Sequence, residues 1–329
     1  MSAVLEIEGL HVSFRGARGW TEVLRDVSLS VAPGEILGVV GESGSGKSVT
    51  SLASMGLLGP SGRIDRGSVR LAGRELTGLD PQALRALRGP EMAMIFQEPG
   101  TSLNPVRRVG NQIAEAMTEH GIPAEEARRR SVALMDRVGI PAAESRARDY
   151  PHQMSGGMKQ RIMIAMALAC NPKLLIADEP TTALDVTIQA QILNLILDLR
   201  DETGMAVLLI THDMGVVSRY ADRVAVMYAG EVVETAPVDR LFSNPGHPYA
   251  SLLMRAIPNA RAAQADLPVI AGSAPPPNRL PRGCRFAPRC PLAIEACRSA
   301  PPALAAIGPA HLSRCIRPDQ IGRLTGEPA

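Results

Sequence analysis

The sequence is poor in aromatic residues and has no apolar run long enough to cross a membrane. Phe, Tyr and Trp make up 3% of the 329 residues, so we expect a core of aliphatic side chains and methionine. A transmembrane helix needs about 20 consecutive, mostly apolar residues. No segment approaches that length. We therefore expect a chain without a membrane-spanning part of its own.

The start of the chain also lacks a secretory signal. Residues 1–10 show no basic stretch followed by an apolar one. This predicts a cytoplasmic location, where disulfides are rare. The net charge of +2 is too small to favour nucleic-acid binding, so we expect no nucleic-acid partner.

The composition changes near residue 258. Before that point the chain alternates apolar runs with turn signals, and hydrophobic residues make up 45% of the whole sequence, enough for a substantial core. After it, prolines are dense and the periodicity is lost. We expect a large domain at 1–257 and a small Pro- and Cys-rich lobe at 258–329.

Hydrophobic patterns predict several elements on both sides of a glycine-rich loop. Residues 23–31 and 36–40 are rich in β-branched and aliphatic side chains and predict strands. The apolar stretch 49–58 after the loop predicts a helix. Late in the large domain, residues 223–227 and 231–235 predict a hairpin.

The middle of the chain predicts a helical part followed by a parallel sheet. Residues 98–170 are expected to be mostly helical. Short apolar runs at 173–177 and 206–211 are typical of buried parallel strands. A helix expected at 187–202 lies between them and completes a βαβ unit, which indicates an α/β fold.

The segment GESGSGKS at 41–48 matches the phosphate-binding pattern G-x-x-x-x-G-K-[ST], with a strand before it and a helix after it. Glycines let backbone N–H groups crowd around phosphate oxygens, and the helix start adds positive potential. Lys47 would contact the β- and γ-phosphates, and Ser48 would ligate Mg²⁺. The nucleotide-binding residues expected here are Gly41, Ser43, Gly44, Ser45, Gly46, Lys47, Ser48 and Val49.

An apolar strand ends in two carboxylates, Asp178 and Glu179. Asp178 is placed to hold Mg²⁺, directly or through water. Glu179 is placed to orient or deprotonate the water that attacks the γ-phosphate. Together with the phosphate loop, this pair predicts hydrolysis of a nucleoside triphosphate.

A second anion cradle occurs at 154–160, where the sequence MSGGMKQ opens a probable helix. One nucleotide site needs only one such anion-binding segment. We therefore expect the second segment to close over a nucleotide that another subunit holds. At this point residues 1 to about 255 resemble an ABC-type nucleotide-binding domain. The resemblance implies that this segment caps ATP bound to a partner, through Ser155, Gly156, Gly157 and Gln160.

The resemblance assigns further residues by position. Phe14 stands where an aromatic ring stacks on adenine, with Trp20 as a competing candidate. Gln97 matches the glutamine that senses Mg²⁺ and links the core to a helical subdomain at about 98–170. Asp185 belongs to a loop that crosses the dimer interface, and His212 matches the histidine that touches the γ-phosphate. The implied fold is a P-loop NTPase core with an antiparallel β subdomain and a helical subdomain.

The tail points to a subfamily. The segment NPGHPY at 244–249 and the Pro- and Cys-containing tail resemble the oligopeptide/dipeptide importer subfamily, which nickel importers share. Residues 97–105 resemble the region where a permease's coupling helix docks. The implied partners are a second, homologous but distinct ATPase chain, two membrane permease subunits and an extracytoplasmic solute-binding protein. The chain would sit peripherally on the cytoplasmic face of the inner membrane.

Four of the five cysteines lie within 32 residues, at Cys284, Cys290, Cys297 and Cys315. In a reducing compartment such a group indicates a metal site. Paired C-x2-4-C zinc spacings are missing, and related subunits with this spacing hold a [4Fe–4S] cluster, which the resemblance therefore implies. Zinc and free buried thiols remain alternatives. Cys170 is expected to pack in the core.

Three other functions stay open at this stage. A nickel or other small-solute importer would share every motif. A soluble ABC ATPase in DNA repair or translation would usually carry two nucleotide-binding domains or a long coiled-coil insertion, whereas only one phosphate loop and one second cradle occur here. In a metal- or redox-sensing regulator, the tail would be the functional part of the chain and would sense the metal or the redox state.

Overall fold

The computed structural model describes residues 2–17, 19–97, 102–181, 185–256 and 270–325. The chain divides into two compact units, each built from several segments. The first unit comprises Met1–Leu5, Val31–Glu35 and Leu71–Ile210. The second unit comprises Glu6–Ser30, Ile36–Arg70 and Thr211–Ala329.

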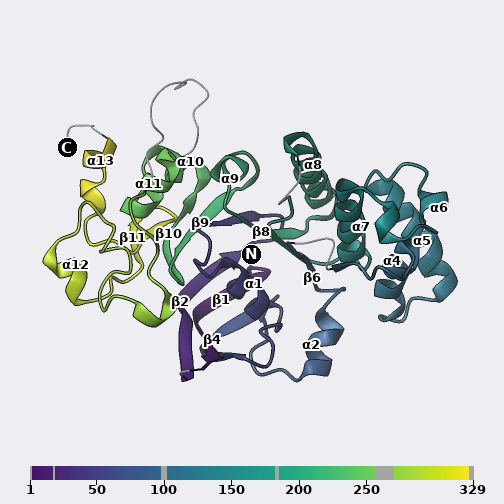
Figure 1. The fold of residues 1–329 in the computed structure, drawn as a ribbon, viewed down its shortest axis with the longest axis horizontal. Helices are drawn as coiled ribbons and strands as arrows, with labels where there is room; N and C mark the ends of the chain where they lie inside the picture. The colour runs from purple at the N-terminus through teal and green to yellow at the C-terminus, as the bar shows by residue number, and fades with distance from the viewer. Residues whose placement is uncertain (1, 18, 98–101, 182–184, 257–269, 326–329) are drawn as a thin grey trace. The chain divides into compact units, whose positions relative to one another are not determined.

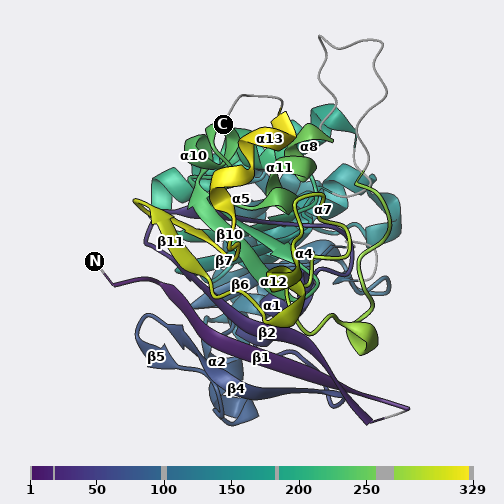
Figure 2. The same cartoon turned by 90° about the vertical axis from the view of Figure 1, so that its left-hand side faces the viewer.

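The second unit contains a small sheet with the strand order β2-β1-β4. These strands are β1 (Leu5–Gly16), β2 (Gly19–Val31) and β4 (Gly62–Leu71). Figure 2 shows β1 and β2 side by side. Only two residues separate them in the sequence, so the pair is antiparallel, because a parallel pair needs a long crossover. The expected antiparallel subdomain is confirmed.

The larger sheet of the second unit has the strand order β11-β12-β10-β9-β3. It contains β3 (Ile36–Val40), β9 (Arg223–Tyr228), β10 (Glu231–Pro237), β11 (Ala305–Gly308) and β12 (His311–Ser313). β3 and β9 are parallel, and β9 and β10 form the predicted antiparallel hairpin. The tail, predicted as a small Pro- and Cys-rich lobe, contributes two of these strands, since β11 pairs with β12 and β12 pairs with β10.

Helices complete the second unit. They are α1 (Lys47–Ser54), α9 (Met214–Tyr220), α10 (Val238–Ser243), α11 (Pro248–Arg255), α12 (Glu295–Ser299) and α13 (Gly322–Thr325). The sequence predicted the first of them at 49–58, but it begins at the loop's own lysine and ends earlier. Gly56 has a φ of 64°, a left-handed conformation that terminates helices.

The first unit contains a parallel sheet, β8-β7-β6. Its strands are β6 (Met92–Ile95), β7 (Leu174–Asp178) and β8 (Ala206–Thr211), and α8 (Val186–Thr203) connects β7 to β8. This is the predicted βαβ unit. Every residue of β7 and β8 is buried, as expected for strands covered on both faces. The short β5 (Arg74–Glu75) and α2 (Pro81–Leu87) precede β6.

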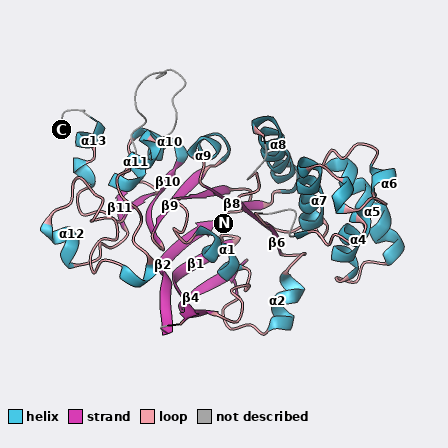
Figure 3. Ribbon diagram, in the orientation of Figure 1, coloured by secondary structure: helices cyan, strands magenta, loops and turns pink. Residues whose placement is uncertain are grey.

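A group of helices follows β6 within the first unit (Figure 1, Figure 3). These are α4 (Val109–Thr118), α5 (Ala124–Arg137), α6 (Ala143–Arg146) and α7 (Gly156–Leu168). The prediction of a mostly helical region is confirmed for its described part. The apolar faces of α4 and α7 supply buried side chains such as Ile113, Met117, Ile162 and Ile164.

Candidate nucleotide site and cysteine lobe

The phosphate loop joins β3 to α1 and folds around the side chain of Lys47. That side chain is only 5% exposed, and its Nζ donates to the carbonyl oxygens of Gly41 at 2.8 Å and Glu42 at 3.2 Å. Ser45 Oγ is buried and has no hydrogen-bond partner among the described residues. The loop therefore presents a buried cation and an unsatisfied hydroxyl, as a phosphate cradle requires.

Two positions of the loop require glycine, position 41 because of a close contact and position 46 because of its backbone conformation. A Cβ at position 41 would lie 2.1 Å from the carbonyl oxygen of Met227 in β9. Gly46 caps α1 with a φ of 103°, a conformation that L side chains rarely adopt. The backbone of the loop is thus packed against β9, and the first N–H groups of α1 follow directly.

Asp178 and Glu179 lie at the end of β7, as predicted, and Gln97 lies after β6. Asp178 is 5% exposed. Glu179 donates its backbone N–H to the carbonyl of Ile210 at 2.9 Å, and its φ is 47°. Such a left-handed conformation is costly for a residue with a Cβ and is concentrated at functional sites. The Gln97 Nε2 donates to Glu179 Oε2 at 3.0 Å, so the structure brings these two residues together.

The second cradle forms the start of α7, as predicted. Ser155 is its N-cap, and its Oγ accepts a hydrogen bond from the N–H of Met158 at 3.3 Å. Gly156 is exposed, and a Cβ at Gly157 would lie 3.1 Å from Ile188 of α8. Gln160 is buried, and its Nε2 has no partner among the described residues.

Asp185 is the N-cap of α8, which follows β7, and His212 lies between β8 and the N-cap of α9. Asp185 caps α8 by accepting a hydrogen bond from the N–H of Ile188 at 2.9 Å. The neighbouring residues 183–184 lie outside the described residues, as do 98–101 of the expected permease-docking segment. His212 is exposed between the end of β8 and Asp213, which caps α9. Their roles stay predictions.

The two adenine-stacking candidates differ in their surroundings. Phe14 is half-buried in β1. Trp20 is 43% exposed, and the guanidinium of Arg63 lies 3.9 Å from its ring centroid, so this ring already stacks with a cation. This contact favours Phe14 as the ring left for adenine, which stays a prediction.

The four tail cysteines line one cavity, together with apolar side chains and His247. None of them forms a disulfide. Burial raises the pKa of the Cys284 and Cys315 thiols to about 11, and it also raises the pKa of Cys290. Backbone N–H groups nevertheless point at these sulfurs, as where Arg317 donates to Cys315 Sγ at 3.3 Å. A bound metal group would displace the thiol protons and use these donors.

Sequence reasoning missed a set of contacts between the tail and the phosphate loop. The N–H of Glu42 donates to the Tyr249 hydroxyl at 2.9 Å. Arg289, next to one of the four cysteines, forms an ion pair with the Glu42 carboxylate at 2.8 Å. Only the general expectation that a buried arginine needs a partner could have suggested this pair.

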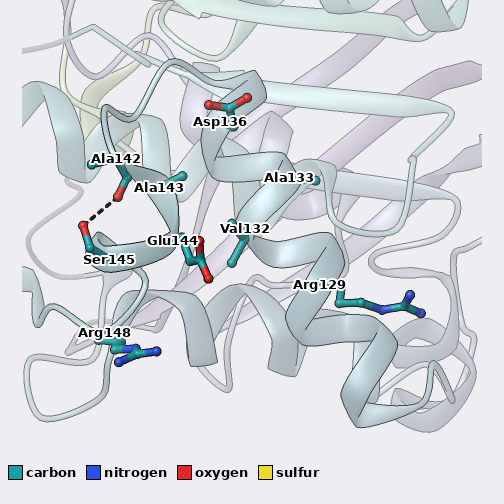
Figure 4. Close-up of a pocket in the computed structure, with 9 residues that line it drawn as sticks. All are labelled: Arg129, Val132, Ala133, Asp136, Ala142, Ala143, Glu144, Ser145 and Arg148. Carbon is teal, nitrogen blue, oxygen red and sulfur yellow. Dashed lines mark hydrogen bonds between the residues drawn. The ribbon is translucent and has the colours of Figure 1, made fainter.

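A separate cavity of about 760 Å³ lies between α5 and α6. Figure 4 shows its lining, which is formed by Arg129, Val132, Ala133, Asp136, Ala142, Ala143, Glu144, Ser145 and Arg148. It contains none of the predicted nucleotide-binding residues. Among the described residues, no helix is long and apolar enough to cross a membrane.

The chain matches two protein-family models. Residues 24–182 match the ABC transporter family model, and residues 233–297 match the model of the oligopeptide/dipeptide transporter C-terminal region. A relative from Brucella abortus is 51% identical over 313 residues, covering 95% of this chain and 94% of its own length. One from Brucella melitensis is 51% identical over 331 residues, covering 97% and 98%. Their provisional names describe both as peptide import ATP-binding proteins.

Solved structures show the same fold. The ATP-binding cassette MJ0796, in a dimeric post-hydrolysis state bound to ADP and phosphate, has a TM-score of 0.64 and 26% identity, covering 71% of this chain and 98% of that one. The cbiO1 protein from Clostridium perfringens, part of the ABC transporter complex cbiONQ, has a TM-score of 0.63 and 26% identity, covering 74% and 92%.

The fold and the motifs define an α/β ATPase of the ABC cassette type. The chain belongs to the ABC transporter family, as an ATP-binding subunit that uses ATP and Mg²⁺ and hydrolyses ATP. The predicted resemblance, fold class and enzyme activity are confirmed.

Proposed function

We propose that this chain powers the import of dipeptides or oligopeptides through a separate membrane permease. The observation that carries the proposal is the match of residues 233–297 to the oligopeptide/dipeptide transporter C-terminal region, in the same chain as the ABC transporter match at 24–182. The names of the Brucella relatives support the same substrate class.

Each of the predicted residues has its own role in ATP hydrolysis. Lys47 and the N–H groups of residues 41–49 bind the phosphates, and Ser48 and Asp178 would hold Mg²⁺. Glu179 accepts a proton from the attacking water or orients it, and Gln97, which donates to its carboxylate, positions that group. His212 contacts the γ-phosphate, and Phe14 stacks on adenine.

Two subunits would act together. The N–H groups at the start of α7 and the capping residue Ser155 close over ATP bound by a partner subunit, and Asp185 borders the same interface. ATP then favours the closed pair because it binds that state more tightly. The partner is a homologous, distinct chain, and the pair sits at the cytoplasmic face of the inner membrane on two permease subunits, served by an extracytoplasmic solute-binding protein.

The tail at 258–329 is proposed as a lobe appended to a nucleotide-binding domain at 1–257, holding a [4Fe–4S] cluster through Cys284, Cys290, Cys297 and Cys315. Their common cavity and the N–H donors at their sulfurs support this. Among the described residues, no three His, Cys, Asp or Glu side chains are grouped closely enough for one metal ion.

The test is transport by the complex isolated through a tag on this chain and reconstituted in vesicles with its solute-binding protein. We expect ATP-dependent uptake of a labelled dipeptide or oligopeptide. Lys47→Ala should abolish it, whereas Lys173→Ala, which removes only a surface ion pair with Glu91, should not. Uptake of nickel in place of peptide would overturn the substrate class while leaving the ATPase intact.

A further inference from the structure

Arg289 uses its whole guanidinium group to connect the tail with the phosphate loop. Its Nη1 and Nη2 donate to the two carboxylate oxygens of Glu42, at 2.8 and 3.1 Å. The remaining donors contact the carbonyl oxygens of Ala271 and Ile270 and the hydroxyl of Tyr228. The side chain is 6% exposed. A bidentate pair of this kind, with a nearly buried guanidinium and a carboxylate that is 28% exposed, is geometrically specific.

Glu42 is a residue of the phosphate loop itself, between Gly41 and Ser43. Its carbonyl oxygen accepts from Lys47 Nζ at 3.2 Å, and its N–H donates to the Tyr249 hydroxyl at 2.9 Å. The backbone of residue 42 is therefore bonded to the lysine that binds phosphate and to α11, and its side chain is bonded to the tail.

The charge of Glu42 opposes the function of the loop. A carboxylate on the loop that binds a triphosphate has the same sign of charge as the ligand, and like charges near a protein surface repel each other. Arg289 neutralises this carboxylate and fixes its direction, because both of its oxygens are engaged. The loop can then present the Lys47 cation without a competing negative charge.

Packing holds Arg289 in place. Phe286, three residues before it, packs edge-on against Tyr228 with ring centroids 5.1 Å apart, and it also contacts Tyr249 at 5.4 Å. Arg285, which is 1% exposed, donates to the carbonyl of Ala229 in the β9–β10 turn. The segment that carries Arg289 is thus anchored on the strands that support the phosphate loop.

We propose that Arg289 is a positioning residue of the ATP site, acting through Glu42 to keep the phosphate loop neutral and correctly shaped for nucleotide. The inference rests on the proposed phosphate-binding role of the loop. Arg289 itself contacts neither nucleotide nor water in this scheme, so its loss should weaken ATP binding and leave the chemical step of the saturated enzyme nearly unchanged.

The experiment measures the Kd of the full chain for Mg-ATP by calorimetry, and KM and kcat for hydrolysis in the isolated complex. Arg289→Gln should raise Kd and KM about tenfold, as expected for one uncompensated charge near the phosphates. The kcat should stay within about twofold. Arg298→Gln is the matched control, since Arg298 follows another of the four cysteines but is exposed.

The double variant Glu42→Gln with Arg289→Gln separates charge from structure. If Arg289 acts through Glu42, removing the carboxylate restores Kd to within about twofold of Glu42→Gln alone. A double variant that binds as weakly as Arg289→Gln would overturn the proposal, as would unchanged affinity in Arg289→Gln. Should Arg289→Gln fail to fold, Arg289→Lys takes its place: it should raise Kd less than tenfold in the wild-type chain and leave Kd unchanged in the Glu42→Gln chain. An equal rise in both chains would overturn the proposal.

Failure of the underlying function gives a different result. If the loop does not bind phosphate, Lys47→Ala binds Mg-ATP as the wild type does. If only the positioning role is wrong, Lys47→Ala loses binding and Arg289→Gln retains it.

Discussion

Gln97 donates a hydrogen bond from its side-chain amide to the carboxylate of Glu179, with 3.0 Å between Nε2 and Oε2. The two residues are 82 positions apart in the sequence and meet at the end of the parallel sheet in the first unit. One oxygen of the carboxylate is thereby engaged and its orientation is restricted. The strained backbone of Glu179, with a φ of 47°, is fixed by its N–H bond to Ile210.

Glu179→Gln should abolish turnover without removing ATP. An amide cannot accept the proton of the attacking water, so we expect phosphate release to fall by at least about a hundredfold. ATP stays bound, and the dimer should accumulate because it no longer reopens. Phosphate release, nucleotide retention and size-exclusion chromatography measure these effects. Glu119→Gln, at an exposed position at the end of α4, is the control. Normal hydrolysis by Glu179→Gln would contradict the assignment of Glu179 as the general base.

Gly156→Asp should separate ATP binding from ATP turnover. The new carboxylate would stand at the first turn of α7, where the cradle is expected to meet a partner's phosphates, so we expect at least about a tenfold loss of turnover. Binding of ATP to the single chain should stay within about twofold, because acidic residues suit a helix start and the fold is kept. ATP binding and hydrolysis are measured on the same preparation.

The matched control for that variant is Ala124→Asp, which adds the same carboxylate at an exposed position in the first turn of α5. It should hydrolyse ATP as the wild type does. Full turnover by Gly156→Asp, or an equal loss in both variants, would contradict a role of this cradle in closing over nucleotide.

Gly230→Ala should destabilise the second unit through a steric clash in the β9–β10 turn. Its φ is 83°, and a Cβ would lie 1.8 Å from the carbonyl oxygen of Val23. We expect a loss of about 3 kcal/mol or more in the free energy of unfolding, since both strain and displacement of β2 contribute. Chemical denaturation provides the measurement.

Gly34→Ala separates the two contributions. Gly34 has a φ of 69° but nothing within 4 Å of a Cβ, so only the backbone strain remains, worth about 1–2 kcal/mol. Equal losses in the two variants would show that the contact with Val23 is unimportant. A loss confined to Gly230→Ala would contradict the expected cost of backbone strain at position 34.

The sequence was sufficient to predict the parts of the molecule that are formed by residues close together in the chain. The phosphate loop, the carboxylates after β7 and the cradle at α7 were found because each motif needs only a strand end or a helix start. The pair of parallel strands around α8 followed from two apolar runs of the right length. Boundaries differed by a few residues where a glycine such as Gly56 ended a helix early.

The contacts of the tail were not predictable from the sequence. The strand β12 is only three residues long, too short for an alternating pattern to be recognised in the sequence, yet Ser313 pairs with Glu234 of β10. Buried charges such as Arg285 contradict the usual surface preference of arginine, and their partners are distant in sequence. The Arg289–Glu42 pair spans 247 positions, and no local pattern encodes such a distance.

Iron, acid-labile sulfide and zinc measured on protein purified without oxygen test the cysteine site. We expect about four irons and four sulfides per chain, with broad absorption near ~400 nm. Cys284→Ser should lose most of this iron. Cys170→Ser should retain it, because Cys170 bonds through its sulfur to the carbonyl of Ala116 and does not line the cysteine cavity. Stoichiometric zinc or no metal would contradict the cluster and leave the ATPase untouched.

Cys290→Ser connects that site with the phosphate loop, because Cys290 follows Arg289 directly. If a cluster holds this segment in place, the variant should lose iron and also raise the Kd for Mg-ATP, in the same direction as Arg289→Gln. Cys297→Ser removes a ligand on α12, away from Arg289 in the sequence, and should lose iron with a smaller effect on ATP. Iron loss in both variants with unchanged ATP affinity would show that the packing of Phe286 and Arg285 suffices to hold Arg289.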